Sequence, residues 1–203
     1  MRDPSNIAGL VRLNPDFIGF IFYPKSKRFI GEKLPDEIQG LIPASIQKVG
    51  VFVDEPFNGL IGKYNRSNLD IVQLHGGELP DYCKGLKEQN IPVIKVFSIT
   101  PDFDFRTINP YEPVCDYYLF DTASESPGGS GIKFNWTKLD QYQGNKPFFL
   151  SGGIQPGDIG QINPIQHQHL YGVDVNSGFE VEPGIKDISK LGSFIDRLRN
   201  IDN

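Results

Sequence analysis

The chain has 203 residues and a formal net charge of −5, a size typical of one α/β domain such as a barrel. Its acidic balance, with no Lys/Arg stripe, argues against a nucleic-acid partner. The sequence shows neither a signal peptide nor an apolar run near the roughly 18 residues that span a membrane. We therefore expect a cytoplasmic protein with no membrane partner. Cys83 and Cys115 form neither a metal-type pair nor a disulfide framework, and we expect no metal site.

Helical patterns alternate along the chain with short apolar runs, which are typical of parallel strands buried on both faces. The expected strands cover residues 17–22, 48–53, 71–75, 93–97, 117–120, 148–151 and 171–175. The expected helices cover residues 3–13, 34–41, 55–64, 79–89 and 187–198, with a weak helix or irregular turn over 101–109 and short helices through 134–136 and after Pro156.

This order of elements narrows the fold. Parallel strands joined by helices form either an open doubly wound sheet or a closed barrel. No GxGxxG follows the first strand, which weakens a dinucleotide-binding interpretation. A closed barrel needs eight strands, and a chain that begins on a helix would lack the first. We therefore predict a single domain over residues 1–203, an α/β (βα)8 TIM barrel with seven of its eight strands present.

The apolar strand Tyr117–Phe120 runs directly into Asp121, an ionisable group where the strand leaves the core. Ligands bind at the carboxyl ends of strands in parallel α/β proteins, so Asp121 is a candidate catalytic group. The glycine-rich GGSG loop that follows, residues 128–131, is a candidate ligand-covering loop. The alternatives are a helix-capping Asp and an ordinary turn.

Two glycine-containing loops follow the last two expected strands. Barrels commonly bind phosphate there through backbone N–H groups, and glycine lets a phosphate oxygen approach an amide closely. The alternative is a pair of ordinary glycine turns. The predicted phosphate-site residues are Gly152, Gly153, Asp174, Asn176, Ser177 and Gly178.

Other polar residues near strand ends are open to two interpretations. Arg28 could bind a substrate carboxylate in bidentate fashion or belong to a solvated charge run. His75 could contact substrate or only hydrogen-bond to backbone. His167 and His169 precede the last strand, which places them at the opposite end of the sheet, as surface residues.

Eight motifs in order resemble the phosphoribosylanthranilate isomerase family of tryptophan biosynthesis: MRDPSNI, IGFIFYPKSKRF, KVGVFVDE, VQLHG, LFDT, GGSG with FNW, LSGGI, and VDVNSG with PGIKD. The resemblance implies a (βα)8 barrel without metal or cofactor. It also implies an Amadori rearrangement of N-(5-phosphoribosyl)anthranilate to 1-(2-carboxyphenylamino)-1-deoxyribulose 5-phosphate. Asp121 would be the general acid that opens the ribose ring, Arg28 would hold the anthranilate carboxylate, and the two glycine-containing loops would hold the phosphate. His75 joins the substrate-binding residues, whereas Lys133 receives no role because Ile132-Lys133 departs from the family pattern.

In the family the first strand ends in a Cys-Gly pair directly before the segment matched here by Met1–Asp3, and that Cys is the general base. Neither is present in the sequence. We expect a complete form with an upstream strand ending in Cys. Losing a general base costs about 10²–10⁴ in rate, so residues 1–203 alone should be a poor enzyme.

Two alternatives remain open. The related isomerase of histidine biosynthesis uses a carboxylate in place of that Cys and a substrate with two phosphates, but only one phosphate site is visible here. A catalytically inactive barrel that binds phosphorylated ligands or serves as an interaction subunit would need neither Arg28 nor Asp121. The sequence leaves open whether the protein is a monomer or a homodimer.

Overall fold

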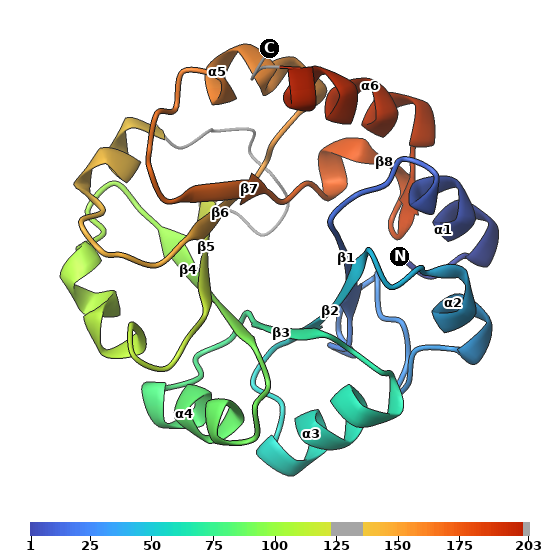
Figure 1. Cartoon of the computed structure of the whole chain (residues 1–203), viewed down its shortest axis with the longest axis horizontal. Coiled ribbons are helices and arrows are strands. Elements are labelled where there is room, and N and C mark those ends of the chain that lie inside the picture. The colour runs from blue at the N-terminus through green and yellow to red at the C-terminus, as the bar shows by residue number, and fades with distance from the viewer. Residues whose placement is uncertain (123–135, 201–203) are drawn as a thin grey trace.

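The computed structural model describes residues 1–122 and 136–200. Its parallel sheet has seven strands in the order β1-β2-β3-β4-β5-β6-β7, and the sheet curls into an inner ring with the helices outside (Figure 1). The strands are β1 (Phe17–Ile21), β2 (Gln47–Phe52), β3 (Ile71–Leu74), β4 (Val93–Ile99), β5 (Tyr117–Thr122), β6 (Phe148–Ser151) and β7 (Leu170–Val173). A separate antiparallel hairpin pairs β8 (Glu180–Glu182) with β9 (Ile185–Lys186).

The α-helices are α1 (Pro4–Val11), α2 (Asp36–Leu41), α3 (Phe57–Arg66), α4 (Pro80–Glu88), α5 (Ile159–Ile162) and α6 (Ile188–Arg199). The 3₁₀ helices are η1 (Phe105–Tyr111), η2 (Trp136–Gln141), η3 (Pro156–Asp158) and η4 (Ser177–Phe179). Helix α1 begins where the sequence predicts, because the Asp3 side chain accepts a hydrogen bond from the Asn6 amide and Pro4 occupies the first turn.

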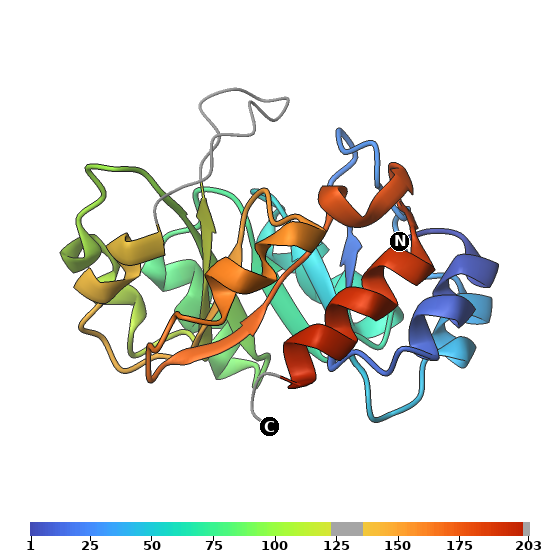
Figure 2. The same ribbon diagram turned by 90° about the horizontal axis from the view of Figure 1, so that it is seen from above.

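Both faces of the sheet are buried, which explains the nearly continuous apolar runs. The side chains that share the inside of the ring are Val49, Ile71, Ile94, Val96, Leu119 and Phe149. Residues on the other face, such as Phe20, Val72 and Phe120, are 0% exposed and belong to the larger cluster that includes the helices. Because the strands are parallel, their carboxyl ends all lie at the same end of the ring, as the arrows of β1 and β5 show in Figure 2.

The ring is not closed by hydrogen bonds. Strands β1 and β7 are the two ends of the sheet, and no other strand within residues 1–122 and 136–200 pairs with their outer edges. Aromatic rings near the amino-terminal ends of the strands nevertheless meet across the opening: the Phe17 ring lies 5.3 Å from that of Phe149 and 6.3 Å from that of Tyr171. The described sheet is therefore a curled, seven-stranded part of a barrel.

The structure confirms the predicted strands and their parallel order, with boundary shifts of a few residues. Strand β5 continues through Asp121, which pairs with Ser98 and Ser151, so this Asp lies within the strand and not just beyond it. The hairpin β8–β9 was not predicted. The GGSG loop and residues 134 and 135 lie outside the described residues. None of the helices in the described part of the chain has the length and hydropathy needed to cross a lipid bilayer.

Candidate active site

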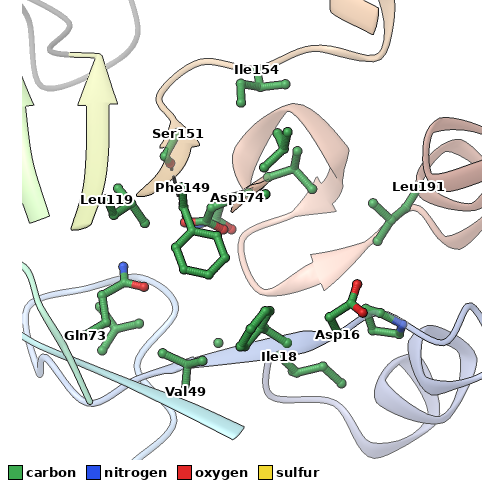
Figure 3. A pocket seen from close by; sticks show the side chains of 18 of the residues that line it. Asp16, Ile18, Val49, Gln73, Leu119, Phe149, Ser151, Ile154, Asp174 and Leu191 are labelled. Carbon is green, nitrogen blue, oxygen red and sulfur yellow. Dashed lines mark hydrogen bonds between the residues drawn. The ribbon is translucent and has the colours of Figure 1, made fainter. Parts of the chain in front are cut away.

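A cavity of about 870 Å³ opens along the carboxyl ends of the strands and the gap between β1 and β7. Phe149 projects into it beside Leu119 and Val49, and Ser151 lies beside Asp174 at its rim (Figure 3). All of the predicted site residues line this one cavity: Arg28, His75, Asp121, Gly152, Gly153, Asp174, Asn176, Ser177 and Gly178. The fold therefore brings together residues that are up to 150 positions apart (178 − 28) in the sequence.

Asp121 and His75 approach each other at the centre of this group. The Nε2 atom of His75 lies 3.4 Å from Oδ2 of Asp121, and the two side chains are 38% and 26% exposed. The carboxylate of Asp121 is thus oriented by a neighbouring imidazole while part of it faces the cavity. This geometry suits a group that exchanges a proton with a ligand.

The two predicted phosphate-site loops pack against each other. Gly152 and Gly153 have φ angles of +96° and +63°, which a residue with a Cβ adopts only with strain. A Cβ on Gly178 would lie 2.4 Å from the carbonyl oxygen of Ile154, so the loop after β7 reaches the loop after β6 only because residue 178 is glycine. Burial raises the pKa of Asp174, and the Ser151 hydroxyl donates to its Oδ2 at 3.4 Å (Figure 3).

Arg28 is held by a residue that the sequence analysis missed. Its Nε lies 2.9 Å from both carboxylate oxygens of Glu180, and its Nη2 also donates to Oε2. The Glu180 side chain is only 4% exposed. Lys186 donates to the same carboxylate, at 3.3 Å, and also lines the cavity. Lys186 stands in the PGIKD motif, which gave it no role: Glu180 faces it across the unpredicted β8–β9 hairpin, and Asn176 lies on the loop after β7.

The loop that carries His75 is fixed from behind by a buried ion pair. Nζ of Lys95 lies 3.1 Å from Oε2 of Glu78, and the two side chains are 4% and 2% exposed. Lys95 also donates to the carbonyl oxygens of Leu74 and Gly76, at 3.3 and 2.8 Å. Glu78 accepts hydrogen bonds from the amides of Gly76 and Asp54, which ties the loops after β2 and β3 together.

The histidines and cysteines predicted to lie outside the site do so, but His167 and His169 are half-buried and are not surface residues as predicted, because the His167 ring packs against Phe148. Nε2 of His167 is 3.2 Å from the carbonyl oxygen of Tyr142, and neither His167 nor His169 lines the cavity around Asp121. Cys83 and Cys115 are buried outside this cavity.

Comparison with known proteins shows which family the chain belongs to. The family model described as N-(5′-phosphoribosyl)anthranilate (PRA) isomerase matches residues 1–197. The chain belongs to this family. The N-(5′-phosphoribosyl)anthranilate isomerase of Phocaeicola vulgatus is 41% identical to it over 199 residues, covering 98% of this chain and 95% of that protein.

Solved structures of the isomerase family share the fold. A phosphoribosylanthranilate isomerase in complex with reduced 1-(o-carboxyphenylamino)-1-deoxyribulose 5-phosphate is 28% identical, with a TM-score of 0.81 over 98% of this chain and 95% of that one. Monomers generated from the dimeric isomerase of Thermotoga maritima are also 28% identical, with a TM-score of 0.78 and the same coverage of 98% and 95%.

These similarities confirm the family resemblance, the isomerase class and the place in tryptophan biosynthesis. The roles of the individual cavity residues stay predictions, and two of them can be tested through properties of the isomerase other than its turnover.

Replacing Gly178 by Ala should separate the two phosphate-site loops, because the new Cβ would lie 2.4 Å from the Ile154 carbonyl oxygen. We expect the free energy of unfolding to fall by about 1–3 kcal/mol and the affinity for inorganic phosphate to fall by about tenfold or more. Denaturant titration and calorimetry measure these changes. Gly157→Ala is the matched control, since nothing lies within 4 Å of a Cβ there; equal phosphate affinity in the two variants would contradict the prediction.

The ion pair of Glu180 should make part of the stability depend on pH. Burial alone would raise the pKa of Glu180, but the hydrogen bonds from Arg28 and the charge of Lys186 outweigh it, so the pKa lies below 4.5. The native chain should therefore have a larger free energy of unfolding than Glu180→Gln. This difference should be largest above pH 4.5 and should shrink as the pH falls toward the pKa of folded Glu180. Urea titrations between about pH 3 and 7 test this. A difference that does not vary with pH would contradict it.

Proposed function

We propose that the chain converts N-(5′-phosphoribosyl)anthranilate to 1-(2-carboxyphenylamino)-1-deoxyribulose 5-phosphate in the cavity between Arg28 and the loops after β6 and β7. The observation that supports this best is that a proton-transfer group, a guanidinium and two glycine-containing loops line one cavity. The isomerase of known structure that binds the reduced product carries a ligand with one carboxylate and one phosphate. Arg28 and the loops are suited to these two anionic ends. We also propose that the enzyme acts in the cytoplasm.

In this proposal Asp121 is the general acid. Its carboxyl group donates a proton to the ring oxygen of the ribose while the bond between C1 and that oxygen breaks, and the anthranilate nitrogen supplies its electron pair to form a protonated Schiff base. Removal of the C2 proton then gives an enolamine, and its tautomerisation gives the C2 ketone. The contact between Asp121 and His75, at 3.4 Å, orients the carboxyl group toward the ring oxygen.

The carboxylate and the phosphate of the substrate would bind to different groups of the protein. Glu180 occupies the edge of the Arg28 guanidinium formed by Nε and Nη2, which leaves Nη1 to donate to the anthranilate carboxylate. The phosphate would lie against the amides of Gly152–Gly153 and Ser177–Gly178, where the three glycines have no Cβ to obstruct a close approach.

We propose that an extended segment fills the gap between β1 and β7 and completes an eight-stranded barrel. In the described part of the chain, no strand pairs with the outer edge of β7, and the outer edge of β1 has only the single bridge between Ile21 and Phe29, which supports this. By the family resemblance that strand ends in the Cys that removes the C2 proton.

The test is to add an apolar strand ending in Cys-Gly before Met1 and to compare it with the same strand ending in Ala-Gly. Both additions should raise the free energy of unfolding, and only the Cys form should raise kcat, by about 10²–10⁴. Equal turnover with Cys and Ala would exclude this strand as the source of the base.

The isomerisation itself is followed by ¹³C NMR with substrate labelled at ribose C2, whose signal should move from an alcohol to a ketone carbon. A chain that binds the reduced product but forms no ketone, with or without the added strand, would instead be the inactive phosphate-binding barrel. A chain that does neither would contradict the proposed function.

A further inference from the structure

Lys186 joins the two anion-binding ends of the cavity. Its Nζ donates to the backbone carbonyl oxygen of Asn176 at 3.0 Å and to the side-chain oxygen of Asn176 at 2.7 Å. It also donates to Oε1 of Glu180 at 3.3 Å. The three N–H groups of the ammonium therefore donate to two partners: Asn176 in the predicted phosphate site, and Glu180, which binds Arg28.

The phosphate side depends on where Asn176 is held. Asn176 directly precedes Ser177 and Gly178 in the loop after β7, and its φ and ψ angles are −133° and −98°. Lys186 binds both its carbonyl and its side chain, which turns the carbonyl oxygen of Asn176 toward the lysine. The amide of Ser177 belongs to the same peptide group and points the opposite way.

The carboxylate side depends on Glu180, which accepts hydrogen bonds from Arg28, the Gly184 amide and Lys186. The backbone of Lys186 is itself fixed, because the Asn6 side chain donates to its carbonyl oxygen and accepts from its amide, both at 2.8 Å. Asn6 of helix α1 therefore fixes the backbone of Lys186 relative to its two partners, Asn176 and Glu180.

Charge gives the lysine a second role. Glu180 and Asp174 both lie close enough to interact with its ammonium group, and its side chain is only 8% exposed. Without this cation, the carboxylates of Asp174 and Asp121, which line the cavity, would face an anionic ligand with one basic side chain fewer on the cavity wall. Burial lowers the pKa of Lys186 in spite of these carboxylates, which is consistent with an ammonium group largely removed from water.

We propose that Lys186 is a positioning residue that sets phosphate selectivity through Asn176 and holds Arg28, through Glu180, for the substrate carboxylate. This inference rests on the proposed function and adds to it a residue that couples the two ends of the ligand. Lys186 does not need to touch the ligand, since its three hydrogen bonds go to protein groups.

The test uses reduced 1-(o-carboxyphenylamino)-1-deoxyribulose 5-phosphate and the same compound after removal of the phosphate, each titrated by calorimetry. We expect Lys186→Met to reduce the preference for the phosphorylated compound by about 10- to 100-fold, the size of one lost hydrogen bond to a charged group. It should also weaken binding of the dephosphorylated compound. Lys190→Met is the matched control: Lys190 is 39% exposed on α6 and pairs with Asp187, so its loss should leave both affinities unchanged.

A double substitution separates the two routes. In an Arg28→Gln background, Lys186→Met should have no further effect on the dephosphorylated compound but should still reduce the phosphate preference. If Lys186→Met proves too unstable to titrate, Asn176→Ala removes one acceptor without leaving a buried charge unpaired. It should weaken the phosphate preference and leave binding of the dephosphorylated compound unchanged.

Three outcomes are distinguishable. A lower phosphate preference and weaker binding of the dephosphorylated compound in Lys186→Met, with no change in Lys190→Met, would support the role of Lys186. Equal affinities in folded Lys186→Met and Lys190→Met, or no loss of phosphate preference in Asn176→Ala, would overturn it while leaving the proposed function intact. A native chain that binds neither compound would overturn the proposed function itself.

Discussion

Asp121→Asn should lower kcat by about 10²–10⁴-fold and leave the affinity for the reduced product almost unchanged. Asn has nearly the same shape as Asp, but its amide has no acidic proton to transfer to the ribose ring oxygen. The rest of the site should stay in place, because β5 is held by backbone pairing of residue 121 with Ser98 and Ser151. Steady-state kinetics with calorimetric binding separate the two effects.

The matched control is Asp140→Asn, an exposed aspartate in η2 that does not line the cavity. Its kcat should equal that of the native chain. If Asp121→Asn instead weakens binding and leaves kcat within about threefold, Asp121 positions the substrate and a different group supplies the proton.

The alternation of strands and helices could be predicted from the sequence because burial on both faces leaves a mark in every strand. Runs such as IGFIF and YYLF have no polar break, and such runs are stable only between two apolar layers. The location of Asp121 followed from the same rule, since the carboxyl ends of parallel strands share one side of the sheet.

The partners of the site residues could not be predicted in this way. Arg28 binds Glu180 across 152 positions, and the two strands of the hairpin that carries Glu180 have three and two residues, too short for any periodic signal. Its Pro183-Gly184 pair does indicate a turn, but a turn signal does not say which distant loop the turn will meet. Lys186 is hidden for the same reason.

Lys95 is the clearest example of a residue whose partner could not be predicted from the sequence. In the run VIKVF it reads as a single polar residue in a strand, and the alternation of side chains directs it away from Ile94 and Val96, which line the inside of the ring. Its partner, Glu78, is the fourth residue of the polar loop that follows β3. Neither position indicates by itself that both side chains are almost fully buried.

Lys95→Met should reduce the free energy of unfolding by about 3–5 kcal/mol, because it removes one member of a buried ion pair and leaves the other charged. The side chain of Glu78 is only 2% exposed, so water cannot replace the lost ammonium group. The amides of Gly76 and Asp54 still donate to Glu78, which favours the lower part of that range. Urea denaturation at neutral pH measures the change.

Two further variants distinguish an unpaired charge from a simple loss of packing. Lys84→Met, on the exposed face of α4, should change the free energy of unfolding by no more than about 0.5 kcal/mol. Adding Glu78→Gln to Lys95→Met should restore part of the lost stability, since it removes the uncompensated charge. If the double variant is no more stable than Lys95→Met alone, the lysine acts mainly through its contacts with the Leu74 and Gly76 carbonyls. The ion pair also fixes the loop that ends β3, so the rescued variant should recover the contact between His75 and Asp121, and with it kcat, to the extent that it recovers stability.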